Sequence, residues 1–134
     1  ILPGQTGVQG GGPQPQGGGE TIVEGMGVVS DPGRLVFNGQ SFPLSVGDNI
    51  VGRASYDSPA TVQIPTPDIY CSRQQVIVTV ARMPGGALRT FVRPYMAKNR
   101  TYVNNQLLQA GEMVVLNDGD RLRMADTVVE FRNK

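Results

Sequence analysis

The chain has 134 residues, a net charge of +1, one cysteine and no histidine. This length fits one domain with or without a tail, and the composition excludes a histidine-based triad, an internal disulfide and a cysteine-cluster zinc site. The near-neutral charge and the lack of any apolar run near ~18–20 residues argue against nucleic-acid and membrane partners. We therefore expect no cofactor and no metal, and the single thiol favours a reducing, cytoplasmic location.

The composition of the first residues is typical of a flexible tail. The first nineteen contain eight of the 18 glycines, three prolines and no charge, a composition that cannot bury enough apolar surface to offset ordering. We expect a flexible linker over residues 1–30 and one domain over 31–134. Within the linker, Thr21 lies between Glu20 and Glu24 and is a candidate phosphosite, with an edge strand or the end of the linker as the alternative. Because the chain does not begin with methionine, we expect it to be part of a longer protein.

From residue 35 onward, short apolar or alternating segments are separated by turn residues. The pairs Asn38-Gly39 and Asn104-Asn105 can adopt positive φ and indicate tight hairpin turns. We expect no helix, and strands at 35–37, 42–44, 49–52, 61–64, 76–81, 88–92, 102–103, 107–108, 113–116, 121–124 and 127–131. Short strands with turns about every ten residues predict an all-β, antiparallel sandwich or barrel.

A polar corner at residues 68–75 leads directly into the apolar strand expected at 76–81. It contains the hydroxyl of Ser72, the guanidinium of Arg73 and two glutamine amides. Between Asp68 and Glu112 the sequence has no acidic residue, whereas its cations there are Arg73, Arg82, Arg89, Arg93, Lys98 and Arg100. A hydroxyl-bearing, locally positive loop on a rigid strand favours phosphate binding.

Three motifs follow one another at a characteristic spacing. They are Gly52-Arg53, then Ser72-Arg73-Gln74-Gln75, then the segment 99–105 with sequence Asn-Arg-Thr-Tyr-Val-Asn-Asn, followed by a Leu-x-x-Gly at 108–111 and a Leu-Asn-Asp-Gly-Asp at 116–120. In this order they resemble a forkhead-associated (FHA) domain over about residues 35–131. The resemblance implies a β-sandwich of about eleven strands with the motif loops at one end. It also implies a protein-interaction module that binds phosphothreonine peptides in signalling and is not an enzyme.

Matching positions imply a role for each site residue. Arg53 would pair with the phosphate, Ser72 would donate its hydroxyl to it, and Arg73 would make a second contact to the phosphate or to a peptide side chain. Asn99 would hydrogen-bond the peptide backbone, with Lys98 as an additional contact. The partner would be a phosphothreonine-containing protein, the substrate of a Ser/Thr kinase. Phosphate chemistry agrees, because a guanidinium fork and a hydroxyl suit a group with three acceptor oxygens.

Three positions depart from the family pattern. Gln75 replaces a histidine that braces the loops, and we expect it to keep one hydrogen bond without the packing. Arg100 replaces a glycine, which costs about 1 kcal/mol if that position needs a positive φ and otherwise adds a cation at the rim. Asn105 also replaces a glycine and tolerates positive φ. These departures keep an alternative open, in which the domain is a degenerate FHA-like scaffold that binds partners without phosphate.

Two further residues are assigned to structure. Cys71 has no activating environment in the sequence beyond Arg73, and we expect a small buried apolar side chain. Thr101 is expected to tie its loop through the hydroxyl. An enzyme is disfavoured because the sequence has no histidine, no motif of paired carboxylates and no glycine-rich loop between a strand and a helix.

Overall fold

The computed structural model describes residues 31–95 and 98–134. The predicted linker over 1–30, including Thr21, lies outside the described residues. Backbone contacts divide the chain into two units, of which the larger comprises residues 32–81 and 89–134. Of the described residues, the smaller unit holds residue 31 and residues 82–88. Within residues 82–88, the amide of Met83 donates to the carbonyl of Ala87 at 2.7 Å and closes a turn.

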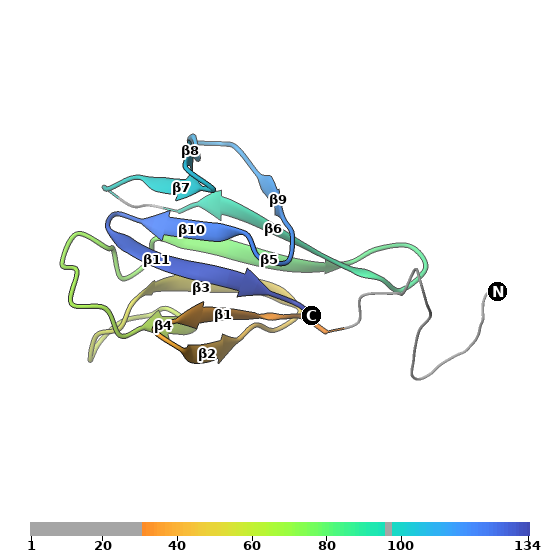
Figure 1. Ribbon diagram of the computed structural model, residues 1–134, viewed down its shortest axis with the longest axis horizontal. Helices are drawn as coiled ribbons and strands as arrows, with labels where there is room; N and C mark the ends of the chain where they lie inside the picture. The colour runs from red at the N-terminus through yellow and green to blue at the C-terminus, as the bar shows by residue number, and fades with distance from the viewer. Residues whose placement is uncertain (1–30, 96–97) are drawn as a thin grey trace. The chain divides into compact units, whose positions relative to one another are not determined.

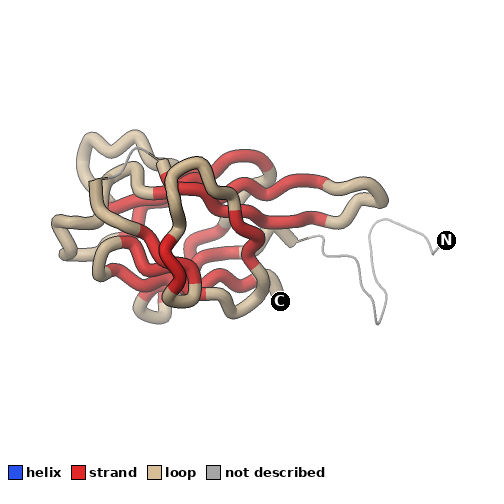
Figure 2. The backbone as a smooth tube through the Cα atoms, turned by 90° about the horizontal axis from the view of Figure 1, so that it is seen from above, coloured by secondary structure: helices blue, strands red, loops and turns tan. Residues whose placement is uncertain are grey.

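The described residues form eleven strands and no helix (Figure 2). The strands are β1 (Arg34–Phe37), β2 (Gln40–Pro43), β3 (Gly47–Arg53), β4 (Val62–Ile64), β5 (Val76–Arg82), β6 (Leu88–Pro94), β7 (Thr101–Val103), β8 (Gln106–Leu107), β9 (Val114–Leu116), β10 (Arg121–Met124) and β11 (Thr127–Arg132). They make a six-stranded sheet in the order β2-β1-β11-β10-β7-β8 and a five-stranded sheet in the order β4-β3-β5-β6-β9 (Figure 1). The predicted all-β sandwich is confirmed.

Both predicted asparagine turns are present. Asn38 and Gly39 have φ of 50° and 77° between β1 and β2, and Asn104 and Asn105 have φ of 48° and 70° between β7 and β8. Two successive residues with positive φ match the right-handed twist of the flanking strands, which is why asparagine and glycine occupy these positions. Asn105 therefore adopts the conformation expected of it.

The two sheets enclose an apolar core. In β5 the alternate residues Val76, Val78 and Val80 are buried, and in β11 Val129 and Phe131 are buried in the same way. The period of two places these side chains on one face of each strand. Burial of such side chains contributes about 1.5–3 kcal/mol each, which makes the sandwich a rigid support for the loops at its ends.

One pairing differs from the purely antiparallel sandwich that the sequence predicts. β4 runs parallel to β3, with Val51 opposite Val62 and Arg53 opposite Ile64. The connecting loop turns back along β3, and the amide of Thr61 donates to the carbonyl of Ile50 at 3.0 Å. The sequence could not show this, because alternation identifies a strand but not the direction in which it pairs.

The pairing register brings the motif loops to one end of the sandwich. Val51 of β3 lies opposite Val76 of β5, and Met124 of β10 lies opposite both Thr101 of β7 and Thr127 of β11. The loops that follow β3, precede β5, precede β7 and join β10 to β11 therefore share that end, on the left in Figure 1. This arrangement is the one that the sequence resemblance implies.

Candidate functional site

Arg53 is the last residue of β3 and is fixed against the loop before β5. Its amide donates to the carbonyl of Ser72 at 2.9 Å, and its Nε donates to the carbonyl of Cys71 at 3.0 Å. The side-chain bond uses one of the five N–H donors of the guanidinium. Arg53 and Ser72, which are separated in the sequence, are thus held side by side with both side chains half-buried.

Gly52 permits this close approach. A Cβ atom at position 52 would lie 2.1 Å from the carbonyl oxygen of Arg73 and 2.6 Å from that of Ser72. Because both contacts are to backbone, no side-chain rotation would relieve them. The Gly-Arg motif therefore has a steric reason: only glycine lets β3 pass directly beneath the Ser-Arg loop.

Gln75 holds two loops of the site together. Its side chain is fully buried; the Oε1 accepts from the amide of Ser72 at 2.8 Å, and the Nε2 donates to the carbonyl of Asn99 at 2.8 Å and to the hydroxyl of Thr101 at 3.0 Å. The expectation of a single retained hydrogen bond without packing is therefore wrong. An amide has two donors and an acceptor on one planar group, so it can brace three partners at once.

Asn99 faces the loop before β5. Its Nδ2 donates to the carbonyl of Tyr70 at 2.8 Å, and its own carbonyl is held by Gln75. Lys98, Asn99 and Arg100 are all exposed. Arg100 is not among the described residues with positive φ, so arginine there carries no left-handed backbone cost and is a cation at the rim.

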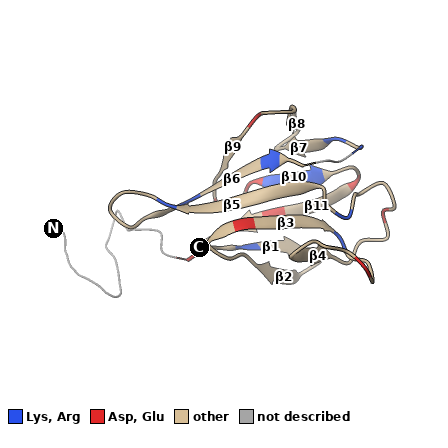
Figure 3. Ribbon diagram, turned by 180° about the vertical axis from the view of Figure 1, so that it is seen from behind, with Lys and Arg blue, Asp and Glu red and all other residues tan. Residues whose placement is uncertain are grey.

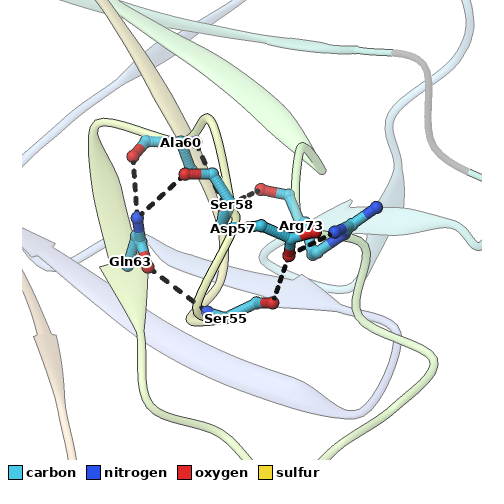
Figure 4. A network of polar contacts seen from close by, with 6 residues as sticks. All are labelled: Ser55, Asp57, Ser58, Ala60, Gln63 and Arg73. Carbon is cyan, nitrogen blue, oxygen red and sulfur yellow. Dashed lines mark hydrogen bonds and ion pairs between the residues drawn. The ribbon is translucent and has the colours of Figure 1, made fainter.

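Arg73 is already engaged by an acidic residue of the loop between β3 and β4. Its Nη1 lies 2.8 Å from Oδ1 of Asp57, which also accepts from the hydroxyl of Ser55 at 3.0 Å (Figure 4). The Ser55 hydrogen bond and the Arg73 guanidinium hold the pKa of the Asp57 carboxyl below its usual value. Sequence reasoning missed this partner, although Asp57 is the one acidic residue between the Gly-Arg and Asp68.

Asp68 anchors the other side of the loop before β5. Its carboxylate accepts from the amides of Tyr70 at 3.0 Å and Asp126 at 2.9 Å, and from the hydroxyl of Thr127 at 3.3 Å. The hydrogen bond from the Asp126 amide is the main reason that the pKa of Asp68 lies below its ordinary value. The sequence placed Asp68 at the start of the polar corner but gave no sign that it fastens the corner to the β10–β11 turn.

Cys71 lies in the same loop, between Tyr70 and Ser72. Its side chain is fully buried, and burial, aided by the nearby charge of Asp68, raises the pKa of the thiol to about 11. A thiol in this state is a poor nucleophile at neutral pH. The prediction of a small buried apolar side chain is confirmed, as is the structural role of the Thr101 hydroxyl.

The structure brings four of the sequence-predicted site residues together. Arg53, Ser72, Arg73 and Asn99 lie on segments joined by the bonds described above, and Lys98 is exposed next to Asn99. The candidate phosphosite Thr21 lies outside the described residues. Within the described ranges, no group of three or more cysteine and carboxylate side chains is placed to hold a metal ion. The same residues include no helix long and apolar enough to cross a membrane.

Comparison with known protein families identifies the family of this chain. The sequence profile of the FHA domain matches residues 49–125, more than half of the chain and all three motifs. The chain belongs to the FHA domain family. FHA domains are protein-interaction modules.

Solved FHA structures share the fold. The FHA domain of MEK1, solved in complex with a phosphothreonine peptide of HOP1, has 21% sequence identity and a TM-score of 0.64, with 78% of this chain and 98% of that chain covered. The FhaA FHA domain, complexed with the intracellular domain of Rv3910, has 24% identity, a TM-score of 0.60 and coverage of 75% and 99%. Full-length yeast Pml1p has 19% identity, a TM-score of 0.62 and coverage of 76% and 80%. Sequence comparison with curated proteins gave no match.

Proposed function

We propose that this FHA domain binds phosphothreonine peptides and joins proteins in a phosphorylation-dependent way. The observation that carries the proposal is the double anchoring of Arg53, whose amide and Nε are bonded to the carbonyls of Ser72 and Cys71. Arg53 is thereby held beside the backbone of Ser72 before any ligand arrives, and the carbonyl of Cys71 fixes its guanidinium. The similar MEK1 FHA domain, which was solved with a phosphothreonine peptide, supports this assignment.

The chemistry of the loops suits a phosphate. A phosphothreonine carries about −1.5 to −2 charge at pH 7 and three strong acceptor oxygens. The terminal donors of the Arg53 guanidinium can meet two of these oxygens, and the Ser72 hydroxyl can meet another. We infer that Asn99, whose backbone carbonyl is linked by Gln75 to the amide of Ser72, bonds the peptide backbone, since an amide can both donate and accept. A single phosphate and a few backbone contacts imply micromolar affinity, about −8 kcal/mol, that weakens with salt.

Arg73 enters this picture through an exchange of partners. Its guanidinium is paired with Asp57 at 2.8 Å, and both side chains are substantially exposed, at 46% and 70%. An exposed ion pair contributes only about 0–1 kcal/mol, so a dianionic phosphate can compete for the guanidinium. We infer that Arg73 is a secondary contact and that Arg53 is the principal one.

Calorimetric titration tests the proposal. A degenerate phosphothreonine peptide pool is compared with its unphosphorylated and phosphoserine versions, using the parent chain, Arg53→Ala and Arg89→Ala. Arg89 is the matched control, because it is an exposed arginine of β6. We expect saturable binding to the phosphothreonine pool alone. Loss of the charge-assisted hydrogen bonds in Arg53→Ala should weaken it by at least about 100-fold.

Thermal melting of both variants confirms that they are folded, since Arg53→Ala also loses the bond to Cys71. If folded Arg53→Ala binds as tightly as the parent, the site is misplaced. Equal binding of phosphorylated and unphosphorylated pools would instead favour the phosphate-independent scaffold. The structure weakens the support that the substitutions at Gln75, Arg100 and Asn105 give to that alternative. Gln75 braces the loops, Arg100 carries no positive φ and Asn105 adopts the turn conformation.

We extend the proposal to the partner and the setting. The partner is a threonine-phosphorylated substrate of a Ser/Thr kinase, and the free thiol of Cys71 fits a reducing, cytoplasmic location. Thr21 is a candidate for such a mark within the same chain, which the domain would bind in cis or in a second copy. Kinase treatment of the parent and of Thr21→Ala, followed by size-exclusion chromatography and peptide titration, tests this. Identical behaviour of the two treated proteins would remove Thr21 from consideration.

A further inference from the structure

A recess adjoins the proposed phosphopeptide site. It opens between the loop before β7 and the turn from β10 to β11, and its lining includes Lys98, Asn99, Arg100, Tyr102, Arg123 and Asp126. We call it the basic pocket. It begins beside Asn99, whose Nδ2 is bonded to the carbonyl of Tyr70, another lining residue. A peptide whose backbone is held by Asn99 would therefore have neighbouring side chains within reach of it.

The walls of the basic pocket are fastened to one another by backbone hydrogen bonds. The amide of Ala125 donates to the carbonyl of Arg100 at 2.9 Å, which joins the β10–β11 turn to the loop before β7. The amide of Asp126 donates to the carboxylate of Asp68 at 2.9 Å, which joins the same turn to the loop before β5. The pocket is thus built from segments already fixed in the free protein.

One cation of the pocket is held in position. Arg123 lies opposite Tyr102 in the pairing of β10 with β7, and its guanidinium carbon is 4.2 Å from the centre of the Tyr102 ring. Its Nη1 also donates to the carbonyl of Ala125 at 2.9 Å. The side chain remains 40% exposed. Stacking and a backbone bond orient the guanidinium, so less side-chain entropy is lost when it binds an anion.

The charge of the pocket is unbalanced. Lys98 and Arg100 are exposed residues of its lining. Figure 3 shows Lys and Arg residues, in blue, on the loop that leads into β7 and on β10. Asp126 is the only acidic residue of the lining. Its Oδ1 lies 3.9 Å from Nη1 of Arg123, and its side chain is 87% exposed. An ion pair of this kind is weak in water. Three cations facing one solvated carboxylate attract a further anion.

We propose that the basic pocket binds an anionic side chain of the same phosphothreonine peptide, either a carboxylate or a second phosphate. This inference rests on the proposed function and deepens it, because it names the class of ligand: acidic or doubly phosphorylated peptides. Arg123 is the specificity-determining residue, since it is the oriented donor of the pocket. Lys98 and Arg100 add charge at the edge and are not required individually.

The test scans a single acidic residue along a neutral phosphothreonine peptide, one position at a time on each side of the phosphothreonine. Each peptide is titrated against the parent, Arg123→Gln and Arg89→Gln, the last being an equal charge change on the exposed face of β6. We expect one position at which aspartate or glutamate improves the affinity of the parent by about two- to fivefold. Phosphoserine at that position should improve it further, because it carries more charge.

In Arg123→Gln the improvement should disappear while the neutral phosphothreonine peptide binds as before, which also shows that the variant is folded. Arg89→Gln should keep the full preference. If the parent binds the neutral peptide but favours an acidic residue at no position, the pocket inference is wrong and the proposed function stands. An acidic preference that survives in Arg123→Gln would also overturn the inference. If no phosphothreonine peptide binds the parent, both fail.

Discussion

Replacing Gln75 with leucine keeps most of the side-chain volume and removes all three hydrogen bonds that brace the loops. The amide of Ser72, the carbonyl of Asn99 and the hydroxyl of Thr101 each lose their partner. A neutral hydrogen bond contributes about 0.5–1.5 kcal/mol net, and a buried group left without a partner costs about 1–3 kcal/mol. Asn99 is exposed and Ser72 half-buried, so they can regain water, whereas Thr101 is only 3% exposed and cannot.

The expected loss in the free energy of unfolding is therefore about 3–4 kcal/mol, a large part of the ~5–15 kcal/mol typical of a domain. Urea denaturation followed by circular dichroism measures it. The midpoint should fall by about 1–4 M with the slope unchanged, since the slope in urea is about 1–3 kcal/mol/M. Gln74→Leu, at the half-buried neighbouring position, is the control and should shift the free energy by less than about 0.5 kcal/mol.

A second variant separates the contribution of the Gln75 hydrogen bonds from that of its side-chain volume. Gln75→His gives a neutral imidazole with one donor and one acceptor, so it can replace at most two of the three bonds. We expect a loss of about 1–2 kcal/mol relative to the parent, smaller than that of Gln75→Leu. A Gln75→Leu protein within about 1 kcal/mol of the parent would refute the reasoning, because it would mean that the three bonds contribute almost nothing net.

Three further predictions concern Gly52, the ionisation of the peptide phosphate and the thiol of Cys71. In Gly52→Ala the new Cβ meets the Arg73 carbonyl at 2.1 Å, so we expect about 1–3 kcal/mol of destabilisation by thermal melting and weaker phosphopeptide binding; an unchanged melting temperature and affinity would contradict the close approach. Since the sequence has no histidine, the affinity for a phosphothreonine peptide should rise between pH 5 and 7 as the peptide phosphate loses its second proton near pH ~6, and then stay level to pH 8. An affinity that does not change from pH 5 to 7 would mean that the dianion is not preferred. Finally, Cys71, with a pKa of about 11, should react with a thiol reagent at pH 8 at least about 100-fold more slowly in the native protein than in urea, where its thiol returns to pKa ~8.5; equal rates would show that the thiol is not buried.

The sequence by itself determined the strands, the tight turns and the order of the motifs. Asn38, Gly39, Asn104 and Asn105 predict positive φ from their own backbone preferences, and the turns adopt it. The apolar run from Val76 to Val80 predicts a strand, and β5 forms there and buries Val76, Val78 and Val80 in the core. These features are local, because each depends on a few neighbouring residues, and for that reason they could be predicted without coordinates.

Only the tertiary structure decided how the site is held together. The bonds from Gln75 to Asn99 and Thr101, the pairing of Arg73 with Asp57 and the bond from Asn99 to Tyr70 join residues 16 to 29 positions apart. Nothing in the local sequence specifies such partners, because the loops meet only after the sheets have paired and packed. The same reason explains the parallel pairing of β3 with β4, since strand direction depends on the path of the connecting loop. The sequence therefore names the residues of the candidate site, and the fold gives them their partners.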